Sequence, residues 1–149
     1  MKSYHDLEIY TLAFDLSVRI RKATLALPNP DKYEVGGQIR RSSQTIKDTI
    51  VEGYGRRRYK SDFIKYLVYS HASLLEATSQ AEFLEASYPY EGWKDFADEL
   101  DKLGVKIHNF IIYVENNWKT WQPDNNDNLT TMTTSSTRQQ SQQSPNFFI

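Results

Sequence analysis

The sequence predicts an all-α protein, an antiparallel up-and-down four-helix bundle followed by a disordered polar tail. Two observations predict the bundle. Apolar or small residues recur with alternating spacings of four and three in four separate segments, which is the pattern of a buried helix face. Proline and glycine separate these segments, and neither period-two runs nor Asn-Gly or Asp-Gly turns predict a strand.

The first predicted helix carries its buried face over residues 9–27 and ends at Pro28, because proline disfavours the helical conformation of the residue before it. The second helix carries its face over residues 39–53, and Gly53 and Gly55 are expected to terminate it. The expected faces consist of Ile9, Ala13, Leu16, Ile20, Ala23 and Leu27 in the first helix, and Ile39, Ser43, Ile46, Ile50 and Gly53 in the second.

The third predicted helix carries its face over residues 63–84, begins with Ser61 as the N-cap and Asp62 in its first turn, and ends near Pro89. The fourth carries its face over residues 96–114. These two faces consist of Phe63, Leu67, Ser70, Leu74, Ala77, Ala81 and Leu84, and of Phe96, Leu100, Leu103, Ile107, Phe110 and Val114. Similar lengths and short links favour antiparallel neighbours, and heptad spacing predicts packing at shallow angles.

The chain is expected to divide into a bundle over residues 1–122 and a disordered tail over residues 123–149. Asn, Thr, Ser and Gln dominate the tail, and such a composition buries too little apolar surface to offset the entropy of ordering. No apolar run is long enough to cross a bilayer, no signal peptide is recognisable, and there is no cysteine. We therefore expect a cytoplasmic protein without a membrane partner.

The net charge of −1 conceals a strong segregation of charge along the chain. Residues 40–65 carry a net charge of +5, whereas residues 76–101 carry a net charge of −7. The protein is therefore expected to offer one surface to anions and another to cations.

Motifs for catalysis or for cofactor binding are not recognisable. Di-iron bundles use Glu-x-x-His pairs, but valines at positions 68 and 105 stand where His71 and His108 would require glutamates. Residues 53–61 fail the Walker pattern because Tyr59 replaces the glycine before Lys60, and no Gly-x-Ser-x-Gly elbow is present. The sequence predicts a non-enzymatic protein with no cofactor and no metal site.

The segment after the second predicted helix combines three arginines, a tyrosine and a lysine. Arginine binds phosphate in a bidentate manner and tyrosine stacks on bases, so this loop is a candidate nucleic-acid site. The candidate binding residues are Arg40, Arg41, Lys47, Tyr54, Arg56, Arg57, Arg58, Tyr59 and Lys60. An alternative stays open, in which the arginines offset the negative C-terminus of the second helix and pair with acidic residues of a neighbour.

Two sequence blocks resemble the signature of the family of 23S rRNA-intervening-sequence proteins. They are Gln38-Ile39-Arg40-Arg41-Ser42-Ser43 and Glu52-Gly53-Tyr54-Gly55-Arg56, and the resemblance extends over about residues 4–118. The chain departs from the family pattern where Ser42 and Ser43 replace alanines, where Thr49 replaces an asparagine, and at Lys47.

The resemblance implies a four-helix bundle that assembles as a homopentameric ring. Relatives of the family include accessory proteins of diversity-generating retroelements, which are similar bundles that bind nucleic acid and a reverse transcriptase. Two functions are therefore expected as alternatives. The first is a nucleic-acid-binding protein or adaptor that binds RNA or DNA, with a nucleic-acid enzyme as a further candidate partner. The second is a purely structural scaffold that uses complementary basic and acidic faces.

Overall fold

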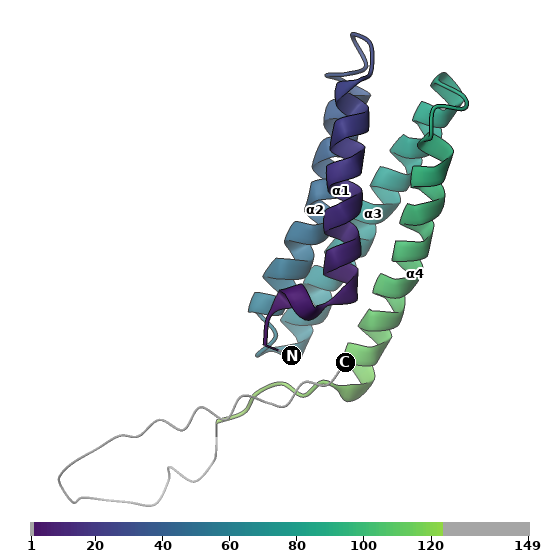
Figure 1. Cartoon of the computed structure of the whole chain (residues 1–149). Coiled ribbons are helices and arrows are strands. Elements are labelled where there is room, and N and C mark those ends of the chain that lie inside the picture. The colour runs from purple at the N-terminus through teal and green to yellow at the C-terminus, as the bar shows by residue number, and fades with distance from the viewer. Residues whose placement is uncertain (1, 124–149) are drawn as a thin grey trace, which may run out of the picture.

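The computed structural model describes residues 2–123 and confirms the predicted fold class. After a short 3-10 turn, η1 (Tyr4–Asp6), four helices follow: α1 (Glu8–Leu25), α2 (Val35–Gly55), α3 (Lys60–Ser87) and α4 (Trp93–Asn117). Successive helices run in opposite directions (Figure 1). The part of the chain that the structure describes contains no strand. The predicted disordered tail lies outside the described residues from position 124 onwards.

The four predicted faces form the core of the bundle. Every residue of the faces on α2 and α3 is buried. Of the first and fourth predicted faces, only Ala23 and Phe96 are half-buried, and both still pack against the core. Trp93 and Trp118, which the predicted faces do not include, are buried at the two ends of α4.

Helices α2 and α3 pack closely because small and hydroxylated residues line their contact. A Cβ atom added at Gly53 would lie 3.0 Å from the Cβ of Tyr66 on α3. Ser70 of α3 donates a hydrogen bond to the carbonyl oxygen of Ile46 at 2.8 Å, which satisfies its buried hydroxyl across the interface.

The start of α3 differs from the prediction. Ser61 is not the N-cap, because the helix begins at Lys60 and Tyr59 precedes it without a capping side chain. The hydroxyl of Thr120 instead accepts a hydrogen bond from the backbone N–H of Lys60 at 3.2 Å. A residue beyond α4 therefore satisfies one of the free N–H groups at the start of α3.

The bundle has two distinct ends (Figure 1). We call the loop end the one that holds η1, the α2–α3 connection and residues 118–123, and the far end the one that holds the α1–α2 and α3–α4 connections. At the far end the Tyr88 hydroxyl donates a hydrogen bond of 2.6 Å to the Asp31 carboxylate, which joins the two connections. Most of the acidic segment 76–101 lies towards the far end, whereas the arginine cluster lies at the loop end.

Candidate nucleic-acid interface

The basic loop, residues 56–60, comprises the α2–α3 connection and the first residue of α3, and its arginines are packed on aromatic rings. Each of the three guanidinium groups lies over a different aromatic ring, an arrangement that adds electrostatic attraction to packing. The distance from guanidinium carbon to ring centre is 4.7 Å for Arg56 over Tyr66, 3.9 Å for Arg57 over Tyr54, and 3.6 Å for Arg58 over Trp121.

The segment that follows α4 is attached to the basic loop by hydrogen bonds. The indole N–H of Trp118 donates to the carbonyl oxygen of Arg57 at 2.8 Å, and the backbone N–H of Trp121 donates to that of Arg58 at 2.9 Å. The ammonium group of Lys60 donates to the carbonyl oxygen of Glu115 near the C-terminus of α4, where the helix dipole favours a cation. The end of α4 and the segment after it thus hold the basic loop through the carbonyl oxygens of Arg57 and Arg58 and through the side chain of Lys60.

The three arginines differ in what they leave available to a ligand. Arg57 is half-buried and donates a hydrogen bond of 2.9 Å to the carbonyl oxygen of Tyr54, so it stabilises the end of α2. Arg56 is exposed and pairs with Glu52 one turn earlier at 3.2 Å. Arg58 is exposed and takes part in no ion pair with any residue in 2–123.

The two tyrosines of the predicted site have different environments. Tyr54 is only 6% exposed and lies between Arg57 and Tyr4, with its ring centre 6.3 Å from that of Tyr4. Its ring therefore supports Arg57 and is not open to a base, contrary to the expectation. Tyr59 is 48% exposed at the surface of the loop and remains available.

The three predicted basic residues of α2 lie apart from the loop. Arg40 is sixteen positions before Arg56, or about 24 Å along a helix. Its guanidinium donates to the Thr24 hydroxyl and to the Lys32 carbonyl oxygen, both at 2.9 Å, so it fastens the α1–α2 connection. Lys47 pairs with its neighbour Asp48 at 2.6 Å, whereas Arg41 is exposed. The structure does not gather these residues into one site with residues 56–60.

Sequence reasoning missed the side chains that position the arginines. They come from three separate segments: Tyr4 from η1, Tyr66 from α3, and Trp118, Thr120 and Trp121 from the segment after α4. One signal was available, because two tryptophans three positions apart follow the last residue of the fourth predicted face. The contact between Arg56 and Tyr66 had no comparable signal, since it depends on how the chain turns between α2 and α3.

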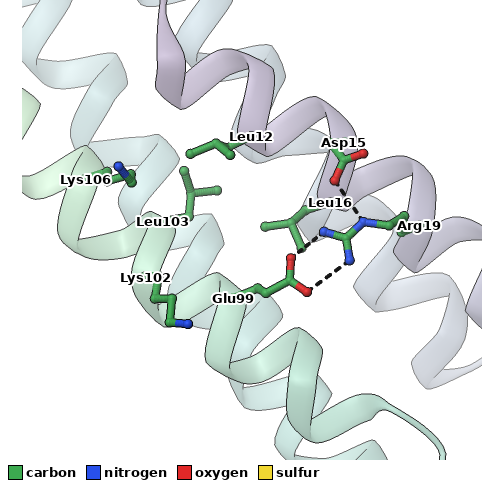
Figure 2. A pocket seen from close by; sticks show the side chains of 8 residues that line it. All are labelled: Leu12, Asp15, Leu16, Arg19, Glu99, Lys102, Leu103 and Lys106. Atoms are coloured by element: carbon green, nitrogen blue, oxygen red, sulfur yellow. Dashed lines mark hydrogen bonds and ion pairs between the residues drawn. The ribbon is translucent and has the colours of Figure 1, made fainter.

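A groove of about 180 Å³ lies between α1 and α4 (Figure 2). Leu12, Leu16 and Leu103 form its apolar floor. At one end the Nε of Arg19 donates a hydrogen bond of 2.8 Å to the Asp15 carboxylate. The two terminal nitrogens of Arg19 donate hydrogen bonds to the two carboxylate oxygens of Glu99. These hydrogen bonds hold the pKa of Glu99 below its usual value, so the carboxylate stays ionised and is poorly suited to donate a proton.

Two histidines, His71 of α3 and His108 of α4, lie with ring centres 6.4 Å apart. Among residues 2–123 no group of three or more histidine, cysteine, aspartate or glutamate side chains is arranged to hold a metal ion.

Within the same residues, no helix is both long and apolar enough to span a membrane.

The fold and the site define a four-helix bundle that presents arginine–aromatic pairs at one end. In a comparison with protein families, residues 5–109 match the family described as 23S rRNA-intervening sequence protein. The match covers well over half of the chain, and the protein belongs to this family. A search of curated proteins finds no match.

Proposed function

We propose that the protein is a non-enzymatic nucleic-acid-binding protein or adaptor that holds a phosphate backbone at the loop end. The observation that carries this proposal is Arg58, an exposed guanidinium fixed 3.6 Å above Trp121 and free of any carboxylate partner within the described residues. Its hydrogen-bond donors are available to a ligand, and stacking restricts its motion before binding. Phosphate is the anion that such a fork of donors fits best.

Two further features support phosphate as the ligand. Arg56 lies on the same loop over Tyr66, and its ion pair with Glu52 is exposed, so exchange of that partner for a phosphate costs little. The description of the family names an intervening sequence of 23S ribosomal RNA, which is compatible with an association with nucleic acid.

Salt-dependent binding to structured RNA and to duplex DNA tests the proposal. The variant Arg56→Ala/Arg58→Ala should bind more weakly than the wild-type protein. The slope of log K against log salt should become shallower by about one to two, because each lost phosphate contact removes about 0.7 to 0.9 from it. Arg57 is left in place because it stabilises the end of α2.

The matched control is Arg21→Ala/Lys22→Ala, which removes the same charge from exposed positions of α1 in the half of the helix nearer the far end. This control should keep the wild-type affinity and slope. Equal weakening by both double variants would mean that only net charge matters, and no binding by the wild-type protein would refute the proposal outright.

A second candidate function, a structural scaffold, is favoured by the separation of charge between the two ends. The basic loop and most of the acidic segment 76–101 lie towards opposite ends of one bundle, so they cannot neutralise each other within a protomer. A contact between the loop end of one copy and the acidic residues of the next would pair them, and such head-to-tail contacts close into rings when the rotation allows. The homopentamer that the sequence resemblance implies is one such ring.

A further inference from the structure

A ladder of aromatic rings begins at the N-terminal turn and continues along α1 at the loop end. The imidazole of His5 stacks on the ring of Tyr4 at 4.1 Å between centres, with an angle of 28° between the planes. Tyr10 meets both rings edge-on, at 4.9 Å from Tyr4 and 5.5 Å from His5. Phe14, 48% exposed, follows at 6.1 Å from Tyr10.

The His5 ring of this ladder is exposed and yet held in position. The Ser3 hydroxyl lies 2.7 Å from its Nδ1, and the same hydroxyl accepts a hydrogen bond from the backbone N–H of His5 at 3.2 Å. A reciprocal capping box between Ser3 and Asp6 fixes the turn itself. An exposed aromatic face therefore stands on a rigid support, which lowers the entropy that a stacking ligand must lose.

The ladder adjoins the basic loop. The ring of Tyr4 lies 6.3 Å from that of Tyr54, and the guanidinium of Arg57 covers Tyr54 at 3.9 Å. A nucleic-acid strand that binds the basic loop through its phosphates is thus in a position to place its bases against the N-terminal turn.

The carboxylates nearest to the ladder in sequence are already bound to positive or hydrogen-bond-donating groups. Asp6 accepts hydrogen bonds from the backbone N–H groups of Lys2 and Ser3, at 2.9 and 3.2 Å. Glu8 pairs with Lys106, and Asp15 pairs with Arg19, both at 2.8 Å. Repulsion between these carboxylates and an approaching backbone is correspondingly reduced.

The geometry points to His5, supported by Tyr4 and Tyr10, as a stacking platform for an unpaired base of an RNA or DNA strand held at the basic loop. This inference rests on the proposed function and specifies its ligand. Base faces are available in single strands, loops and bulges but are covered inside a duplex, and histidine is among the side chains on which such bases stack. The site therefore favours unpaired strands.

Binding of fluorescently labelled oligonucleotides of about 12 nucleotides, within the range of known single-strand sites, tests this inference. The probes are a uridine RNA, a thymidine DNA and a blunt duplex of the same length. We expect tighter binding of the single strands than of the duplex. His5→Ala should weaken single-strand binding about 5- to 30-fold, as expected for one lost stacking contact, and His5→Phe should retain it.

The matched control is Tyr33→Ala, which removes a ring that is 69% exposed in the α1–α2 connection and should change nothing. Circular dichroism of each variant verifies folding. A preference of the wild-type protein for the duplex, or wild-type affinity in His5→Ala, overturns the inference. If in either case Arg56→Ala/Arg58→Ala still weakens binding, the proposed function stands without it. If the wild-type protein binds no probe, the inference fails, and binding of structured RNA or long duplex DNA then decides the proposed function separately.

Discussion

Gly53 and Gly55 lie two positions apart in α2 but meet very different surroundings. A Cβ atom at Gly53 would lie 3.0 Å from the Cβ of Tyr66 and 3.3 Å from the ring of Phe63, whereas a Cβ atom at Gly55 would meet nothing within 4 Å. Gly53 is therefore required for the close approach of α2 to α3, and Gly55 has no such steric role.

We expect Gly53→Ala to lower the free energy of unfolding by about 1 to 3 kcal/mol, the usual cost of overpacking a tight interface. Gly55→Ala should be neutral or should stabilise the protein by up to about 1 kcal/mol, since alanine restricts the unfolded chain more than glycine does. Urea denaturation of both variants measures this difference. Equal midpoints for the two variants would contradict it.

Arg40 and Arg41 are a second pair of neighbours with unequal roles. Arg40→Ala removes hydrogen bonds to Thr24 and Lys32, so we expect a loss of about 1.5 to 3 kcal/mol in the free energy of unfolding. Arg41→Ala, at an exposed position, should stay within about 0.5 kcal/mol of the wild-type protein. Thermal unfolding followed by circular dichroism separates them, and equal losses would mean that the contacts of Arg40 do not stabilise the fold.

At the scale of the helices, α1 and α4 are joined across their groove by ion pairs. Arg19 lowers the pKa of Glu99, so this carboxylate binds its proton less readily in the folded than in the unfolded chain. The stabilisation is therefore fully present above the ordinary glutamate pKa of about 4.3 and is lost as the pH falls through the lower folded value. Both side chains are partly exposed, which limits the contribution to about 1 kcal/mol.

Replacement of Glu99 by glutamine should thus destabilise the protein near neutral pH, and the difference from wild type should shrink in acid. Urea denaturation at a series of pH values measures it. Glu82→Gln, at an exposed position of α3 without an ion pair in the described chain, is the control and should follow the wild-type pH dependence. A difference for Glu99→Gln that stays constant down to acid pH would mean that the ion pair is not its source.

The helices themselves were largely predictable from the sequence, because the buried faces follow a strict heptad spacing and proline or glycine lies near most helix ends. The heptad spacing did not mark Trp93 and Trp118 as buried. Both rings lie beside the predicted face of the fourth helix, and such a ring is buried only if the end of a neighbouring helix covers it. Ser61 failed as an N-cap for a related reason. The helix begins one residue before Ser61, and the hydroxyl of Thr120, from a distant segment, accepts the hydrogen bond of its first N–H group.

At the scale of the whole molecule, the sequence located the basic loop but not its geometry. Three consecutive arginines were visible, whereas the rings beneath them come from positions 54, 66 and 121. Trp121 also lies beyond residues 5–109, the part that matches the family. The exposed pair of Arg58 and Trp121 therefore depends on a residue outside the matched region.

The separation of charge between the two ends leads to a prediction about self-association. If copies pair basic loop to acidic segment, Arg56→Glu/Arg58→Glu should dissociate the assembly, because it places like charges in contact. Glu82→Lys/Asp101→Lys, at exposed acidic positions of α3 and α4, should do the same. An equal mixture of the two variants should associate more than either variant alone, since a contact between different variants brings opposite charges together. Light scattering at low and at molar salt measures the mass, and an assembly that survives both double variants and molar salt would show that other contacts hold the copies together.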